Sequence, residues 1–398
     1  MKKVYLLGTC DTKYPELAYA KSLLEKAGVT ACLVDVGIFP HTNPIDIANT
    51  EVAKYHPKTP GFLTDVKDRG EAVGAMGEAL EAFILSRNDV AGVLGMGGTG
   101  NTALVTCAMR ALPVGIPKLM VSTVASGDVS PYVGPTDICM MASVADVAGL
   151  NPITRRVLGN AAHAVAGMVV NSVPEVTAVK PLLGMTMFGV TTPCVLKLIS
   201  FFEDKYDPLV FHATGTGGQA FEKLIDSGML KYVIDVTLTE VCDLFMGGVM
   251  SAGPGRLDSI ARTGIPYVGS LGALDMVNFA AKNTVPAQYA SRKLHVHNAN
   301  VTLMRTTPAE NAEMGRWIGE KLNNCPGEVR FLIPEGGVSV IDAPGQPFYD
   351  PEADKALFDA IEGAVKQTQK RKLLRLPRNV NDPEFAEALA EQFRSINN

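Results

Sequence analysis

The sequence GMGGTGNTALV, Gly95–Val105, is the clearest indication of how this chain folds. Its four glycines and two threonines lie between the apolar run VAGVLG and a segment with the apolar spacing of a helix. Glycine permits backbone conformations that other residues avoid, and it lets backbone N–H groups come close to a bound group. A strand, a glycine-rich turn and a helix in this order are typical of a doubly wound α/β domain.

The same order of apolar run, polar turn and helical pattern recurs along the chain. KVYLLG precedes PELAYAKSLLEKAG, a helical pattern that ends at Gly28, and VTACLVDVG follows as the next apolar run. Apolar runs that alternate with helices predict a parallel sheet with helices on both faces.

The pattern restarts near residue 180. LLGMTMFGVTTPCVLKLISFFEDKYDPLVFHATGTGG parallels the beginning of the chain, and ATGTGGQAFEKLIDSG resembles the first glycine turn. We therefore predict an α/β protein with two Rossmann-like parallel-sheet subdomains and a cleft between them. The subdomains are expected at residues 1–180 and 181–398, with the boundary between residues 175 and 182. The 398 residues fit this division, since a domain takes roughly 150 residues.

Composition excludes several classes of protein. The net charge of −5 and the lack of a long basic run argue against nucleic acid as a partner. No apolar run approaches the roughly 20 residues of a membrane span, and Asp11 interrupts the first apolar run too early for a signal peptide. The seven cysteines form no CxxC pair and resemble reduced core thiols. We expect a cytoplasmic protein that acts on a small molecule.

The first glycine turn predicts an anion site. Gly95–Gly100 matches GxGxxG, but it does not follow the first strand, and the expected acidic residue about 20 positions later is missing, so we discount NAD. The chain also lacks GxxxxGK[ST], which excludes a Walker-type site. What remains is a helix, expected to begin at Asn101, whose free N–H groups attract a phosphate. The alternative is a turn that only lets the helix pack on the sheet.

Residues at the same sheet edge extend this candidate site. Asp11 could ligate Mg²⁺ that bridges phosphates, or it could cap the following helix. VSTVASGD, residues 121–128, ends the next strand and supplies hydroxyl groups, unless it is only a solvated loop. Apart from Asp11, the predicted ligand-binding residues are Gly97, Gly98, Thr99, Gly100, Asn101, Thr102, Thr123, Ser126 and Gly127.

The second half offers four candidate catalytic residues. Arg256 could bind a carboxylate or phosphate as a fork, and Glu240 and Asp258 could act as acid and base. His212, in HATGTGG, is the fourth candidate. Structural ion pairs are the alternative, because they mimic functional clusters.

Two further patterns lie near the end of the chain. His295 and His297 alternate on an expected strand and so face one side, as a metal pair would, but no third ligand has the right spacing. A packed histidine pair is the alternative, and Arg305 could complete an anion pocket nearby. The Gly- and Pro-rich segment at residues 333–348 is expected to be a binding lid or a surface loop.

The longer blocks around these turns resemble an uncharacterised bacterial family. That family shares its domain with the ATP-binding part of the plant inhibitor of tomato mosaic virus replication. The resemblance covers residues 1 to about 370 through the blocks LLGTCDTK, GMGGTGNTALVT, VSTVASGDVSPYVGPTDICMM, FHATGTGGQAFE, MSAGPGRLDSIARTGIPYVGSLGALDMVNF and VIDAPGQPF.

The resemblance implies ATP binding in the first half, at Gly97–Thr102, Thr123–Gly127 and Asp11. It also implies a homodimer or higher homo-oligomer. Some relatives carry an additional barrel domain, so a separate barrel-domain protein is a possible partner.

Three functions remain open from the sequence. The first is an ATP-binding protein that transfers a phosphoryl or adenylyl group to a small molecule, with Mg²⁺ as helper. The second is a sensor that closes on a nucleotide or metabolite without catalysis. The third is an acyl- or carbonyl-directed enzyme that uses the arginines and acids of the second half without nucleotide.

Overall fold

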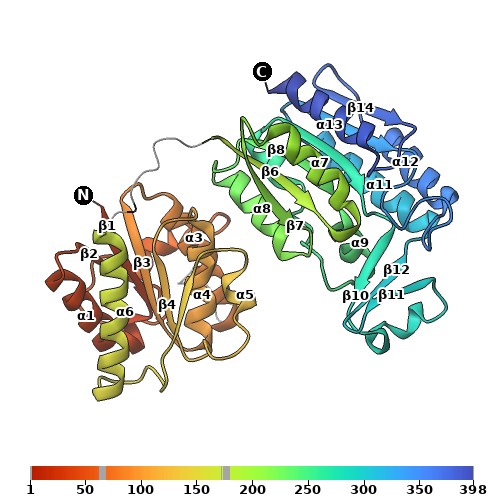
Figure 1. Cartoon of the computed structure of the whole chain (residues 1–398). Helices are drawn as coiled ribbons and strands as arrows, with labels where there is room; N and C mark the ends of the chain where they lie inside the picture. Colours follow the sequence, from red (N-terminus) through yellow and green to blue (C-terminus); the bar gives the residue numbers. More distant parts are fainter. Residues whose placement is uncertain (1, 62–68, 172, 174–179, 398) are drawn as a thin grey trace. The chain divides into compact units, whose positions relative to one another are not determined.

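The computed structural model describes residues 2–61, 69–171, 173 and 180–397. These residues form two compact units, Met1–Glu175 and Val176–Asn398, each built on its own parallel sheet (Figure 1). The expectation of two Rossmann-like α/β halves is therefore confirmed. Most of the predicted boundary at residues 175–182 lies outside the described residues, and the cleft expected between the halves stays a prediction.

The first unit contains one five-stranded sheet. Its strands lie in the order β2-β1-β3-β4-β5, and every neighbouring pair is parallel. Its elements are β1 (Lys3–Gly8), α1 (Cys10–Lys26), β2 (Ala31–Asp35), α2 (Asn49–Ala53), α3 (Arg69–Leu85), β3 (Val90–Gly97), α4 (Thr99–Ala111), β4 (Lys118–Ser122), α5 (Ser130–Val133), β5 (Cys139–Ala142) and α6 (Pro152–Val170).

Helices cover both faces of this sheet. One hydrophobic core joins the sheet to α1 and α6, and a second joins the other face to α3 and α4. Strand β3 is buried at nearly every position, as expected for a strand with both faces covered. A Cβ atom at Gly95 would lie 2.6 Å from Val105 Cγ1 and 2.7 Å from Met120 Sδ, so glycine is needed for α4 to pack closely on the sheet.

Helix α4 begins two residues earlier than the sequence predicts. Gly98 is its N-cap, with φ −80° and ψ −170°, and Thr99 is its first residue. The side chain of Asn101, which was expected to open the helix, instead donates a hydrogen bond to the carbonyl of Met96 (2.5 Å).

The second unit repeats the strand order of the first. Its six-stranded sheet has the order β14-β13-β9-β8-β6-β7, again with parallel neighbours. Numbered within each unit, the strands lie 2-1-3-4-5 in the first and 2-1-3-4-5-6 in the second. The elements of this sheet and its helices are β6 (Leu182–Met187), α7 (Thr192–Phe202), β7 (Asp207–His212), α8 (Thr216–Asp226), β8 (Tyr232–Thr237), α9 (Thr239–Met246), α10 (Asp258–Thr263), β9 (Tyr267–Gly272), α11 (Pro308–Asn323), β13 (Val329–Pro334), α12 (Pro351–Ala364), β14 (Arg371–Leu376) and α13 (Pro383–Ile396).

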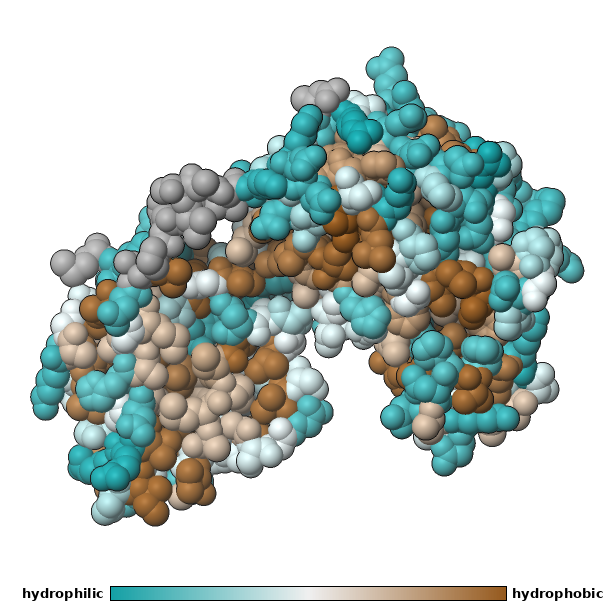
Figure 2. All heavy atoms as spheres, viewed as in Figure 1, coloured by the Kyte–Doolittle hydropathy of each residue, from teal (hydrophilic) through white to brown (hydrophobic). Residues whose placement is uncertain are grey.

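The second unit also carries a small antiparallel sheet that the sequence analysis missed, apart from the strand with the two histidines. It consists of β10 (Met276–Phe279), β11 (Leu294–Asn298) and β12 (Val301–Arg305) in the order β10-β12-β11. Figure 2 shows hydrophobic residues among hydrophilic ones on the lobe that these strands form. In the described part of the chain, no helix is both long enough and apolar enough to cross a membrane.

The packing of α4 on β3 gives a stability prediction. Gly95→Ala should destabilise the first unit by about 1–3 kcal/mol, because the added Cβ atom overpacks the contact with Val105 and Met120. Gly74→Ala, in α3, is the matched control, since a Cβ atom there meets nothing within 4 Å and alanine favours the helix. In denaturant unfolding, the midpoint should be lower than that of the unaltered protein for Gly95→Ala only. An unchanged midpoint for Gly95→Ala would contradict the packing argument.

Candidate functional site

The candidate site of the first unit lies at the carboxyl ends of its strands, beside the point where the strand order reverses. β1 has β2 on one side and β3 on the other, so the chain leaves β1 and β3 toward opposite sides of the sheet. In open parallel sheets, ligands bind at the carboxyl ends of the strands near such a reversal. The turns that follow β1 and β3 contain Asp11 and Gly97–Thr102, which the sequence analysis selected.

The start of α4 leaves backbone donors available. No side chain caps this helix, and its first backbone hydrogen bond runs from the N–H of Thr102 to the carbonyl of Gly98 (2.9 Å). The N–H groups of Thr99, Gly100 and Asn101 precede that bond and have no acceptor within the helix. Together with the helix dipole they favour an anion at this position.

A pocket of about 670 Å³ opens beside these donors. It brings together four of the predicted residues, Gly98, Thr99, Thr123 and Ser126, with residues 142–146. Thr123 and Ser126 are exposed, and no hydrogen bond among the described residues uses their hydroxyl groups or that of Thr99. These three hydroxyls are therefore available to a ligand.

Residues 142–146 belong to the pocket, although the sequence analysis did not select them. They comprise the last residue of β5 and the segment after it, and all five line the pocket, with Ser143 and Asp146 as the polar ones. Val144 is 80% exposed and has φ +66°, a conformation that β-branched residues rarely adopt. Strained backbone of this kind concentrates at functional sites. No motif in the sequence marks this segment, so only the strand order could have pointed to it.

Two predicted ligand-binding residues have other roles. Thr102 is fully buried, and its hydroxyl bonds to the carbonyl of Gly98 (2.9 Å) and to Ser122 Oγ (2.6 Å). It fixes the turn and has no donor left for a ligand, which corrects the prediction for this residue. Gly127 lies outside the pocket lining, and its N–H bonds to the carbonyl of Val124 (3.0 Å).

Asp11 lies in the first turn of α1, one position beyond the start of the helix. α1 contains a kink at Lys13, its N-cap is Thr9, and the Asp11 carboxylate accepts a hydrogen bond only from the Thr12 hydroxyl (3.4 Å) among the described residues. The alternative that Asp11 caps this helix is therefore wrong. A Cβ atom at Gly37 would lie 3.0 Å from carboxylate oxygens of both Asp11 and Asp35, which places these two acids close together. Among the described residues, no three or more His, Cys, Asp and Glu side chains are grouped to hold a metal ion. A role for Asp11 toward Mg²⁺ stays a prediction.

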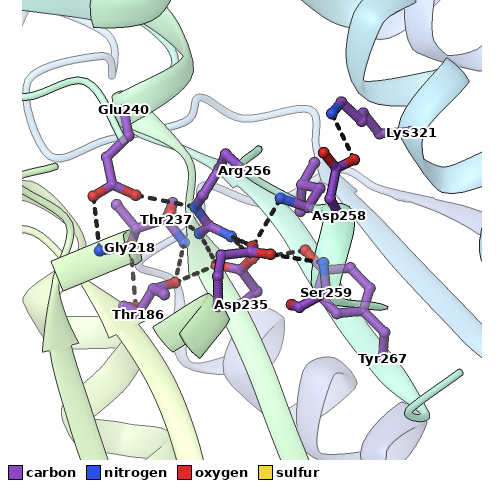
Figure 3. A network of polar contacts seen from close by, with 12 residues as sticks. Thr186, Gly218, Asp235, Thr237, Glu240, Arg256, Asp258, Ser259, Tyr267 and Lys321 are labelled. Carbon is purple, nitrogen blue, oxygen red and sulfur yellow. Dashed lines mark hydrogen bonds and ion pairs between the residues drawn. The ribbon is translucent and has the colours of Figure 1, made fainter. Parts of the chain in front are cut away.

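In the second unit, Arg256 is the centre of a buried ion network (Figure 3). Its guanidinium group is 1% exposed and bonds to Asp235 in a fork (2.7 and 2.8 Å), to Glu240 (3.0 Å) and to Glu222 (3.1 Å). Tyr267 also donates its hydroxyl to Asp235 (2.9 Å). The predicted fork exists, but its carboxylate partners belong to the protein itself.

Glu240 occupies the place that a ligand would take at the second glycine turn. Its Oε1 accepts the N–H groups of Gly215 (2.7 Å) and Gly218 (3.0 Å), at the start of α8. A Cβ atom at Gly218 would lie 2.0 Å from Glu240 Oε2, so glycine is needed for this contact. Burial raises the pKa of the Glu240 carboxyl, and the charge of Arg256 opposes that shift. This turn is filled by the protein's own carboxylate.

The other second-half candidates lie apart from this network or pair elsewhere. Asp258 forms an ion pair with Lys321 (2.6 Å) at the edge of the same region. His212 is exposed at the end of β7, and its ring stacks on Phe188 with centroids 5.3 Å apart. Arg305 does not complete an anion pocket, because it is buried against Asp342 and Asp354. Burial and the charge of Asp342 raise the pKa of Asp354 to about 8.

The buried network gives a second stability prediction. Arg256→Ala should destabilise the second unit by about 3–5 kcal/mol, because it leaves three carboxylates without their buried cation. Acidification should restore part of that loss, since protonation removes the uncompensated charges. Arg262→Ala is the control, because Arg262 pairs with Asp226 at the surface and such pairs contribute about 0–1 kcal/mol. Equal unfolding midpoints of the two variants across pH 5–8 would contradict the structural role.

Comparison with known proteins places both units in one family. Residues 2–174 match the N-terminal domain of an uncharacterised protein family, UPF0261, and residues 180–397 match its C-terminal domain. A UPF0261 protein of Rhizobium meliloti is 55% identical over 398 residues, which is 100% of each chain. The ToMV resistance protein Tm-1(GCR237) of Solanum lycopersicum is 42% identical over 423 aligned positions, covering 99% of this chain and 56% of the tomato protein.

A solved structure, the UDP-GlcNAc 2-epimerase of Methanocaldococcus jannaschii, was also matched. It is 10% identical with a TM-score of 0.23, over 68% of this chain and 83% of its own. The expected relationship to the tomato resistance proteins is confirmed by the sequence matches, and the chain belongs to the uncharacterised protein family UPF0261.

Proposed function

We propose that the first unit binds the phosphate groups of ATP in the pocket beside the start of α4. The main support is that the N–H groups at this helix start have no side-chain cap and lie beside a pocket of about 670 Å³. Pockets of about 300–1,000 Å³ hold ligands of nucleotide size. The choice of ATP among phosphate-bearing ligands comes from the resemblance of the sequence blocks.

Each part of the proposed site has a distinct role toward the phosphates. The N–H groups of Thr99 and Gly100 supply donors on the helix axis, where the dipole is most favourable. The hydroxyls of Thr99, Thr123 and Ser126 supply donors from the rim. Gly98 leaves room for the phosphate, because a Cβ atom placed there would meet only Thr123 Oγ1, at 3.8 Å.

The charge of the lining points to a metal–nucleotide complex as the ligand. The described residues that line the pocket include one acid, Asp146, and no lysine or arginine. A bare triphosphate would meet only partial positive charges there, whereas Mg²⁺ would neutralise it and could be approached by Asp146. We therefore propose that the protein binds ATP together with Mg²⁺.

If the protein turns over ATP, the proposed reaction is phosphoryl or adenylyl transfer to a small molecule. A second candidate function, binding without turnover as a sensor, is favoured by the arrangement of the catalytic candidates. Arg256 and Glu240 bond to each other in the interior, and Asp258 pairs with Lys321. Arg256 and Glu240 are thus engaged inside the protein, and one carboxylate oxygen of Asp258 is held by Lys321. Analysis of incubations with ATP and Mg²⁺ for ADP and AMP separates the two functions.

The assembly and location of the protein remain part of this proposal. We propose a cytoplasmic homodimer or higher homo-oligomer that acts without nucleic acid or membrane. A separate barrel-domain protein stays a proposed partner, since the tomato relative is longer than this chain. Size measurement with and without ATP tests whether assembly depends on the nucleotide.

The site predicts opposite effects of one substitution on stability and on binding. Gly98→Asp places a carboxylate at an N-cap whose backbone is already extended (φ −80°), so it should raise the unfolding midpoint. The same carboxylate would occupy the N–H groups and repel phosphate. Affinity for ATP with Mg²⁺, measured by calorimetry, should therefore fall by about tenfold or more.

Gly98→Asn is the matched control for charge, because it caps the same N–H groups without a negative charge. It should raise the unfolding midpoint by a similar amount and lower the affinity for ATP less than Gly98→Asp does. Wild-type affinity in Gly98→Asp, or no saturable ATP binding by the unaltered protein, would contradict the proposed site. A thermal shift with ATP provides an independent measure of binding.

A further inference from the structure

A second pocket, of about 510 Å³, lies in the second unit at the carboxyl ends of β6 and β7. Most of its lining is apolar, and the apolar side chains come from several elements of the unit. They include Phe188, Val190, Met250, Leu303, Val340 and Ile341. A pocket of this size and character removes a small apolar molecule from water, which is the main source of affinity in such sites.

Three imidazoles are the principal polar groups of this pocket. His212 ends β7, and His295 and His297, two residues apart on β11, both line this pocket. The common face predicted for that pair stays a prediction, because Asn298 also lines the pocket and the register of β11 shifts between Val296 and Asn298. Within the described part of the chain, no hydrogen bond uses a ring nitrogen of these three histidines. The pocket thus holds unused hydrogen-bonding groups beside apolar walls.

The arrangement favours an organic ligand over a metal ion. Among the described residues, no three such side chains are grouped closely enough to coordinate a metal. His212 and Phe188 both line the pocket, and their rings stack on each other at an interplanar angle of 24°. Aromatic side chains in a pocket lining suit an aromatic ligand, because aromatic rings pack favourably in offset-stacked or edge-to-face pairs.

We infer that this pocket binds a small molecule with an aromatic body and one carboxylate. The apolar side chains surround the body, and N–H groups of the imidazoles donate to the carboxylate oxygens. The described lining residues include no aspartate or glutamate that would repel the carboxylate. The inference does not depend on nucleotide binding in the first unit.

Calorimetric titration with 2-naphthoate tests this inference, with 2-naphthamide as the uncharged control. The whole protein should bind 2-naphthoate saturably and about tenfold or more tightly than 2-naphthamide, since only the carboxylate gains charge-assisted hydrogen bonds. Changing His212, His295 and His297 together to glutamine should remove that preference. Absence of saturable 2-naphthoate binding, or equal affinity for the amide in the unaltered protein, would overturn the inference.

Two valines provide a matched pair of variants. Val340 lines the pocket and is 43% exposed, whereas Val296 is 49% exposed on β11 and does not line it. Val340→Glu should lower the affinity for 2-naphthoate by about tenfold or more through charge repulsion, and Val296→Glu should leave that affinity unchanged. Equal losses would overturn the assignment of the pocket. Gly98→Asp should still bind 2-naphthoate, so failure of the nucleotide site and failure of this site are distinguishable.

Discussion

The N–H groups at the start of a helix need acceptors, and the two glycine turns of this protein meet that need differently. At the start of α8, Glu240 accepts the N–H groups of Gly215 and Gly218. At the start of α4 no side chain takes that role. Two turns that look alike in sequence therefore differ in their hydrogen bonding. The N–H groups of one are occupied by the protein's own carboxylate, and those of the other have no side-chain acceptor.

The internal carboxylate depends on further buried charges. Glu240 is stable in the interior because Arg256 lies against it, and Arg256 in turn needs Asp235 and Glu222. Buried charges persist only when each is paired and hydrogen-bonded, so the network acts as one unit that joins β8, α8 and α9. Glu240 and Arg256, which resembled functional residues in the sequence, thus help to hold the second sheet and its helices together.

The sequence predicted the part of the site that follows from strand order. Gly98, Thr99, Thr123 and Ser126 meet in one pocket because parallel strands end at the same edge of the sheet. Side-chain direction could not be predicted in the same way, and Thr102 turns inward to Ser122. Two features could not be predicted because they depend on contacts between distant segments: the place of residues 142–146 in the pocket and the hydrogen bond from Gly215 to Glu240. The positive φ of Val144 could not be predicted either, because no sequence pattern indicates it.

The repeated strand order does not repeat the site. In the first unit the pocket lies at the ends of β3, β4 and β5, the third to fifth strands of the unit. In the second unit the helix after the third strand, α9, begins with buried residues, and the pocket lies at the ends of the first two strands. Because loops decide which strand ends stay open, one architecture provides a pocket beside an uncapped helix start in one half and an apolar pocket with imidazoles in the other.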